Sequence, residues 1–424
     1  MKVLIISHNP ISTYQNMGKT ILSLFESFDC EELCQLYIYP SIPDVKKCNS
    51  YFRITDKDII RSFYQFSVDG KEIIPNKNIH NKFTNERDVK IYSNKNNKKS
   101  SRKLIRDVLW KCSRWYNKPL KSWLNKENPE CIFLAPGDAK FIYDIALKIS
   151  KKKNIPIVTY ICDDYYFVEK PNNIIAKIQL ASLQKKIRKL LKKTSHVITI
   201  CDDLRDAYSK NFNVSATTIM TGSNHPIANC PIYKEPQSIT YMGNVGLNRY
   251  VSITELGMAL DEINLQYKTN YSLKIYTSAN DSEILDEFKK ANSISLCGYV
   301  SGENFEKVFY SSELLLHTEG FDDNSIDRVK ASISTKIADS LGSGIPLIAY
   351  GPDSVASMKH LINNNCAIII TKKEYLKDTL LKAFNDENFR SDVVQNALRV
   401  ANDYHFAQTN SKRLYEILLK VRID

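Results

Sequence analysis

Short apolar runs that alternate with helix-like segments are the feature that most restricts how this chain can fold. The runs at 2–7, 131–135 and 155–161 are rich in Val, Ile and Leu and are bounded by polar residues. Periodic segments such as 172–193 and 249–265 lie between runs of this kind. This alternation is typical of βαβ units, so it predicts an α/β fold with parallel sheets covered by helices.

The chain is too long for one ordinary hydrophobic core. It has 424 residues, 43% of them hydrophobic, which predicts two globular domains. The segment 222–237 places one Gly and three Pro residues between two series of strand-like runs, as a linker does. We therefore predict domains at 1–225 and 226–403, with a C-terminal helix at 404–424 that packs back toward the first domain.

Two absences in the sequence bear on the compartment. No run of about 18 apolar residues is present, and Asn9 and Pro10 interrupt the apolar N-terminus, so we expect neither a transmembrane helix nor a signal peptide. The ten cysteines are scattered without a C-x-x-C pair, which predicts free thiols in a reducing compartment and no zinc site. We expect a cytoplasmic protein, with peripheral attachment to the inner face of a membrane as an open alternative.

The whole chain has a net charge of +12, and its positive charge is concentrated in the first half. Residues 95–126 include eleven Lys or Arg and one acid, and residues 185–193 include six and none. Such patches fit an anionic membrane surface or a phosphate-bearing substrate, and equally a solvated helix face. No known nucleic-acid-binding module accompanies them, so we expect no nucleic-acid partner. The Asn- and Lys-rich stretch 75–100 is predicted to be a loop.

The residues after the strand-like run 238–242 are suited to an anionic ligand. Gly243 and Asn244 begin a turn through which the backbone can approach a ligand closely. Arg249, at the start of the next helix, can fork onto a diphosphate. A plain strand-to-helix turn is the alternative reading of the same residues.

A second set of candidate ligands surrounds the helix at 334–342. Ser334 and Thr335 are well placed to cap its N-terminus, which attracts phosphate, and Lys336 adds a cation. Asp339 shares a helix face with Lys336 and can accept hydrogen bonds from a ribose. The alternative is an ordinary capped helix with a Lys–Asp pair on its surface.

Residues 238–350 resemble the nucleotide-sugar-binding domain of GT-B glycosyltransferases, especially glycosyltransferase family 4 and related capsule and lipopolysaccharide enzymes. The matching parts are Glu319-Gly320-Phe321, Asp339 five residues before Gly344, the loop Gly243–Arg249, and the segment Leu296–Val300, which contains Tyr299. The resemblance implies two Rossmann-like domains facing a cleft. It also implies a retaining transfer of a sugar from a nucleoside diphosphate to an acceptor hydroxyl, in surface polysaccharide or glycolipid synthesis.

The resemblance also implies roles for individual residues. Arg249 and Lys336 would stabilise the nucleoside diphosphate as it leaves, Asp339 would hold the ribose, and Glu319 would contact the donor sugar. Tyr299 lies in the base-contacting segment. In the family the two acids are eight residues apart, whereas Glu319 and Asp339 are twenty apart. Either a loop is inserted between them, or Glu319 is not the equivalent residue. The nucleotide sugar is a co-substrate, and no cofactor is expected.

We expect the acceptor, a saccharide or a lipid-linked saccharide, to bind the first domain. Asp163 and Asp164 follow the run 155–161, and one carboxylate could orient or deprotonate the acceptor hydroxyl. His8 ends the first run and either contacts the ligand or only packs. Gly18 suits both a small-residue turn facing the acceptor and a simple helix start. No convincing D-x-D pattern is present, so no metal is predicted.

Three other functions fit the same sequence. A sugar-nucleotide epimerase shares the GT-B fold, a basic nucleic-acid- or membrane-binding protein would explain the charge, and a scaffold could keep a degenerate site. Release of nucleoside diphosphate that depends on an acceptor would distinguish the transferase from all three.

Overall fold

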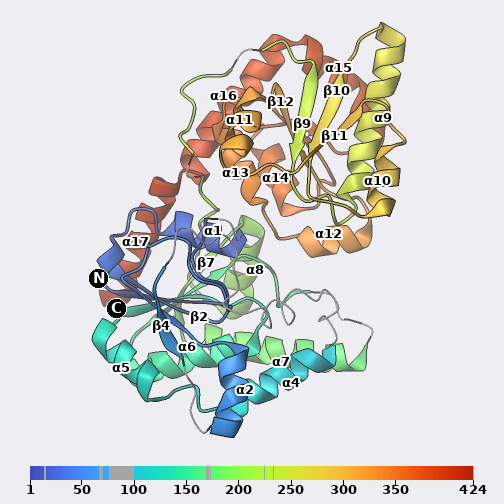
Figure 1. Ribbon diagram of the computed structural model, residues 1–424. Helices are drawn as coiled ribbons and strands as arrows, with labels where there is room; N and C mark the ends of the chain where they lie inside the picture. The colour runs from blue at the N-terminus through green and yellow to red at the C-terminus, as the bar shows by residue number, and fades with distance from the viewer. Residues whose placement is uncertain are drawn as a thin grey trace. The chain divides into compact units, whose positions relative to one another are not determined.

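The computed structural model describes residues 1–13, 16–65, 70–75, 100–168, 171, 173–223, 225–232 and 234–423, and the predicted loop at 75–100 lies almost entirely outside them. The chain divides into two compact units (Figure 1). The first contains Met1–Thr221 and Asn410–Asp424, and the second contains Gly222–Thr409. The first unit therefore ends just before the boundary predicted at residue 225. Within the described residues, no helix is both long and apolar enough to cross a bilayer.

The first unit is built on a sheet whose described strands run in the order β4-β3-β2-β1-β5-β6-β7-β8. All neighbouring strands are parallel except β3 and β4, which are antiparallel. β1, β5 and β6 are buried along their whole length, as expected for parallel strands covered on both faces. The strands are β1 (Val3–Ser7), β2 (Leu33–Tyr37), β3 (Ser50–Arg53), β4 (Lys71–Ile73), β5 (Cys131–Ala135), β6 (Ile157–Ile161), β7 (Thr194–Thr199) and β8 (Ala216–Thr218).

Helices connect these strands, and the last helix of the chain returns to this unit. Ser411 accepts a hydrogen bond from the backbone N–H of Ser27 at 2.9 Å, and Arg422 pairs with Glu130 at 2.7 Å. The C-terminal helix is thereby fixed to the first unit. The helices are α1 (Asn16–Leu24), η1 (Cys30–Glu32), α2 (Asp56–Gln65), α4 (Ser100–Cys112), α5 (Lys118–Glu127), α6 (Lys140–Lys153), α7 (Ile174–Leu191), α8 (Asp202–Phe212) and α17 (Ala407–Ile423).

The second unit has a parallel sheet whose described strands run in the order β11-β10-β9-β12-β13-β14. The strands are β9 (Ser238–Met242), β10 (Ser272–Tyr276), β11 (Ile294–Gly298), β12 (Leu314–Thr318), β13 (Leu347–Tyr350) and β14 (Ile368–Ile370). The helices are α9 (Arg249–Tyr267), α10 (Ser282–Phe288), α11 (Glu303–Ser311), α12 (Asp323–Val329), α13 (Thr335–Gly342), α14 (Ala356–Asn363), η3 (Lys373–Tyr375), α15 (Leu376–Asn385) and α16 (Glu387–Tyr404).

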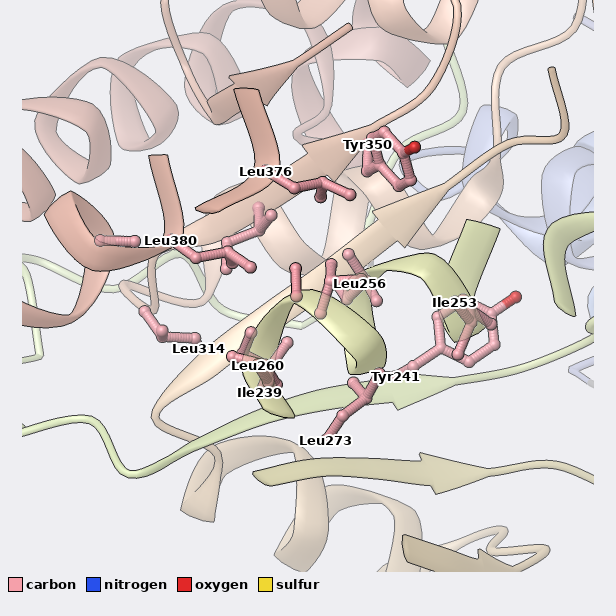
Figure 2. Close-up of a cluster of buried hydrophobic side chains, with 14 of the residues drawn as sticks. Ile239, Tyr241, Ile253, Leu256, Leu260, Leu273, Leu314, Tyr350, Leu376 and Leu380 are labelled. Carbon is pink, nitrogen blue, oxygen red and sulfur yellow. The ribbon is translucent and has the colours of Figure 1, made fainter. Parts of the chain in front are cut away.

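The core of the second unit forms where α9 packs on the sheet. Figure 2 shows Ile253, Leu256 and Leu260 of α9 beside Ile239 and Tyr241 of β9, and all five are buried. These helix residues recur at helical spacing, so they line one side of α9. This packing fixes the start of α9 at the carboxyl end of β9.

The segment between Glu319 and Asp339 contains a helix that the sequence did not predict. α12 occupies Asp323–Val329, and the side chain of Asp322 caps it by accepting a hydrogen bond from the N–H of Ser325 at 3.0 Å. An additional helix between β12 and α13 therefore accounts for the long spacing between the two acids.

Candidate active site

Two neighbouring strands of the second sheet bring an arginine and a glutamate together. β9 and β12 are parallel, so the residues that follow them meet at one edge of the sheet. Arg249, the first residue of α9, directs Nε and Nη2 to Oε2 of Glu319 at 2.8 and 2.6 Å. Its Nε also donates to the carbonyl oxygen of Thr318 at 3.2 Å. Two residues predicted for the donor side thus form one largely buried ion pair.

Lys336 lies close to this pair, against Gly243. Its Nζ is 5.1 Å from the centroid of the Tyr241 ring, and a Cβ on Gly243 would overlap Nζ. Gly243 also has φ at 145°, which favours glycine, and any side chain here would displace the Lys336 ammonium. Desolvation and the charge of Arg249 lower the pKa of Lys336 to about 8, although Glu319 acts in the opposite direction. The residue as a whole is exposed, so water moderates this shift.

Glu319 is the acid at the centre of this group. It is 3% exposed, and its pKa is raised because burial outweighs the attraction of Arg249 and Lys336. With all three side chains ionised, the group holds two cations and one anion. A positive surplus at the carboxyl edge of a parallel sheet suits a phosphate-bearing ligand. The three residues are named the donor cluster below.

The loop between β9 and α9 is shaped by its own side chains. Oδ1 of Asn244 accepts a hydrogen bond from the N–H of Gly246 at 2.7 Å. The backbone carbonyl oxygen of Asn244 accepts one from Tyr241 Oη at 2.5 Å. Asn248 has φ at 53° and donates through Nδ2 to Asp322 at 2.8 Å. Asn244, predicted as a ligand contact, therefore also holds the turn that presents Gly243.

His317 is a residue of this site that the sequence interpretation missed. It is buried near the end of β12, and within the described residues its Nε2 has no hydrogen-bond partner. Nε2 lies 3.7 Å from Oε1 of Glu319. Burial and the charges of Arg249 and Lys336 lower the pKa of His317 to about 3, so the ring is neutral near pH 7. The alternation of side chains along a strand pointed to it, because His317 and Glu319 are two residues apart and therefore share one face.

The start of α13 holds the remaining predicted phosphate and ribose ligands. Ser334 occupies the N-cap position and Thr335 is the first helical residue, but the Ser334 side chain makes no capping hydrogen bond. Asp339 is 5% exposed, and its Oδ1 accepts a hydrogen bond from Oγ of Ser223 at 2.7 Å. Contact between Asp339 and a ribose would require that hydrogen bond to be shared or exchanged.

The segment predicted to contact the base lies at the edge strand β11. Tyr299, just beyond this strand, is 70% exposed, and Gly298 has φ at 79°. An exposed aromatic ring at such a turn is able to stack on a nucleobase. No group of three or more His, Cys, Asp or Glu side chains in the part of the chain that the structure describes is arranged to hold a metal ion.

In the first unit, His8 and Gly18 lie near the carboxyl end of β1. Nη2 of Arg106 lies 3.1 Å from Nε2 of His8, and Nδ1 of His8 lies 2.9 Å from Oδ1 of Asn9. Because arginine only donates, Nε2 accepts and Nδ1 carries the proton. Burial, followed by the charge of Arg106, lowers the pKa of His8. A Cβ on Gly18 would lie 2.6 Å from the carbonyl oxygen of Pro10, so α1 approaches this loop closely at the glycine.

The two adjacent acids after β6 have different environments. Asp163 accepts a hydrogen bond from Tyr165 Oη at 3.2 Å and lines a small hollow of about 20 Å³. Asp164 accepts hydrogen bonds from the N–H groups of Tyr166 and Phe167 at 2.8 and 2.9 Å. Asp164 therefore holds the local turn, whereas Asp163 bonds a neighbouring tyrosine and lies at the carboxyl end of β6, beside a hollow with room for about one water molecule.

No model of a known protein family matches the sequence, and no curated protein matches it. Solved structures match over nearly the whole chain. HepE from Anabaena in complex with UDP has a TM-score of 0.65 at 11% identity, over 99% of this chain and 100% of that one. Sucrose-phosphate synthase from Thermosynechococcus elongatus gives 0.58 at 12% identity, over 99% and 98%. An α,α-trehalose-phosphate synthase (UDP-forming) from Burkholderia vietnamiensis gives 0.58 at 8% identity, over 99% and 100%.

These solved structures are GT-B glycosyltransferases, and they share with this chain two parallel sheets in one α/β architecture. The chain therefore has the GT-B fold, as the resemblance in its sequence implied.

Proposed function

We propose that this protein is a glycosyltransferase that moves a sugar from a nucleoside diphosphate sugar to an acceptor hydroxyl. The observation that carries the proposal is the donor cluster, in which Arg249 and Lys336 lie around the carboxylate of Glu319. HepE was solved with UDP, with UDP and glucose, and with UDP-glucose, so this fold accepts such a donor in another protein.

The chemistry follows from charge. Breaking the bond between the sugar and the diphosphate leaves additional negative charge on the nucleotide. Arg249 and Lys336 neutralise this charge, and because they are already held in place, little reorganisation is needed in the transition state. Glu319 fixes the orientation of Arg249 and contacts the donor sugar. Gly243 allows the diphosphate to approach the backbone beside Lys336.

The rest of the donor is assigned to neighbouring residues. The ring of Tyr299 stacks on the base, Asp339 binds the ribose after releasing Ser223, and the N-terminus of α13 at Ser334 and Thr335 donates backbone N–H groups to phosphate. Since the nucleotide is a co-substrate, the proposal includes no resident cofactor or metal.

The acceptor is assigned to the first unit. Asp163 orients or deprotonates the acceptor hydroxyl at the carboxyl end of β6, and His8 and Gly18, near the carboxyl end of β1, belong to the same acceptor side. Asp164 supports Asp163 by holding the turn. We propose a saccharide or lipid-linked saccharide acceptor, a retaining transfer, and a role in surface polysaccharide or glycolipid synthesis on the cytoplasmic face of a membrane.

A thermal-shift screen against UDP-, GDP-, CMP- and dTDP-sugars tests donor binding first. The expected result is a raised melting temperature with one class, lost in Arg249→Ala and kept in Lys307→Ala, a matched cation change on α11 of the same unit. Nucleoside diphosphate should then be released only when an acceptor saccharide is present. Epimerised sugar nucleotide without an acceptor, or no binding of any donor, would overturn the proposal.

A further inference from the structure

Two helices of the first unit, α4 and α7, carry an exposed apolar surface. They lie beside one another (Figure 1) and line, together with α6, a hollow of about 180 Å³. Several large apolar side chains exposed on two neighbouring helices are a mark of an interaction site. The large apolar side chains on this surface, named the α4–α7 face, are 43% to 73% exposed and comprise Leu104, Ile105, Val108, Ile174, Ile175 and Ile178.

The exposed apolar residues are spaced at helical intervals, so those on each helix lie on one side of it. On α4, Leu104 and Val108 are one helical turn apart and point outward. Trp110 takes the other side of the helix, where it is 1% exposed and stacks on Phe141 with ring centroids 4.1 Å apart. α4 therefore has two apolar sides, of which the core uses only one.

Lysines follow the apolar residues on the outward side of α7. The helix presents Ile174 and Ile178 in its first half and Lys185 and Lys189 in its second half, all exposed. Lys177 on α7 and Lys111 on α4 are also exposed, so they add positive charge near the apolar side chains. None of these four lysines forms an ion pair within the described residues.

The hollow between the helices does not account for this charge. Its three cations are each paired with a carboxylate, so the lining is close to neutral. The pairs are Lys103–Asp138 at 2.6 Å, Arg106–Asp56 at 2.9 Å and Lys140–Asp107 at 2.8 Å. The positive surplus therefore lies on the outer surface, next to the exposed isoleucines, and not in the hollow.

We propose that the α4–α7 face docks on an anionic lipid bilayer. An apolar stripe bordered by lysines matches the boundary between acyl chains and anionic headgroups, with the isoleucines inserted and the lysines at the level of the phosphates. The inference goes beyond the proposed function, because it does not depend on the donor cluster. The proposal assigns membrane contact to α4 and to the outer side of α7. These two helices contain only part of the charged stretches 95–126 and 185–193.

Flotation with phosphatidylcholine vesicles, with and without phosphatidylglycerol, tests this proposal on the full chain. We expect binding to be at least about tenfold stronger to the anionic vesicles and to weaken as salt is raised. The variant Ile174→Asp/Ile178→Asp and the variant Lys185→Glu/Lys189→Glu should each lose at least about tenfold in binding. The matched control Leu265→Asp/Lys307→Glu changes an 86% exposed leucine and an exposed lysine of the second unit and should bind as the unchanged chain does.

Equal flotation with both vesicle types, no flotation, or the same loss in the control would overturn the proposal. All substituted side chains are exposed, so melting temperatures should stay unchanged, and a drop would reveal misfolding. A less drastic pair, Ile174→Ser/Ile178→Ser, then repeats the test. Binding of UDP measured in parallel should be the same in every variant, so failure of the donor assignment is recognised separately from failure of this surface.

Discussion

The carboxyl edges of the two sheets arrange their charged residues in opposite ways. In the second unit, Arg249 and Lys336 share one carboxylate, that of Glu319, and the buried Nε2 of His317 has no hydrogen bond within the described residues. In the first unit, cations near His8 are matched with carboxylates, and Asp164 is bonded to backbone N–H groups.

This difference indicates which edge is built for a charged ligand. Surplus positive charge and an unsatisfied buried ring nitrogen are unfavourable until a ligand with negative charge and acceptor oxygens binds. A balanced edge suits a neutral acceptor hydroxyl, which needs orientation more than charge compensation. Electrostatics therefore favours the second unit for the donor, whereas Asp163 is assigned to the acceptor by its place at the carboxyl end of β6.

The largest expected effect comes from removing the central cation. Arg249→Ala should lower kcat/KM by about 100- to 1,000-fold, because the developing charge on the diphosphate loses its main partner. Glu319 would also stay buried without its ion-pair partner, so the double variant Arg249→Ala/Glu319→Gln separates lost catalysis from lost stability. Steady-state kinetics and melting curves measure both quantities. Activity within about threefold of the unchanged chain would contradict the role of the cluster.

The acceptor edge should respond in a different way. Asp163→Asn should lower transfer by about 100-fold while the affinity for UDP stays the same, since the carboxylate acts on the acceptor. Asp164→Asn is the matched control, because an asparagine oxygen can still accept the hydrogen bonds from Tyr166 and Phe167. Calorimetry with UDP and assays with a saccharide acceptor provide the comparison. Equal loss in the two variants would remove the distinction between them.

The pH dependence of donor binding sharpens the comparison further. The pKa of Lys336 is lowered to about 8, so the ammonium is present below that pH and is lost as pH rises through it. The affinity for UDP should therefore weaken above pH 8, by up to about tenfold per pH unit. Lys336→Arg should remove this dependence, because a guanidinium stays charged. Calorimetric titrations from pH 7 to 10 test this, and an unchanged profile in the variant would assign the titration to another group.

The smallest expected effect belongs to His317. Its ring is neutral and its Nε2 is free to bond a donor oxygen or water, so His317→Gln should raise KM for the donor by roughly 2- to 10-fold. Because its pKa is lowered to about 3, the substitution should leave the pH profile between 5 and 8 unchanged. A changed profile in that range would show that the ring titrates during the reaction.

Buried parallel strands were the part of the fold best predicted from the sequence. β5 and β9 have the predicted bounds; β5 is a continuous apolar run, as strands covered on both faces are, and β9 alternates polar residues with β-branched and aromatic ones. β3 and β4 were missed because they are short, and β4 is largely exposed. α12 was missed because it is brief and polar, and its start depends on one hydrogen bond from Ser325 to Asp322.

The candidate site was predictable in its residue types more than in its contacts. The sequence indicated Gly243 and Arg249 from the turn after a strand and Lys336 from the N-terminus of a helix, and the structure brings them together. It did not reveal that Asp339 bonds Ser223, because this contact joins residues distant in sequence. It also did not distinguish His317 from a core residue, since a histidine within an apolar strand usually packs there.

A crystal structure of the protein with UDP tests the central claim most directly. The account predicts the diphosphate within hydrogen-bond distance of both Arg249 and Lys336, above Gly243, with the uracil against the segment that contains Tyr299. A diphosphate bound elsewhere in the chain, with the Arg249–Glu319 pair untouched and Lys336 facing solvent, would contradict it.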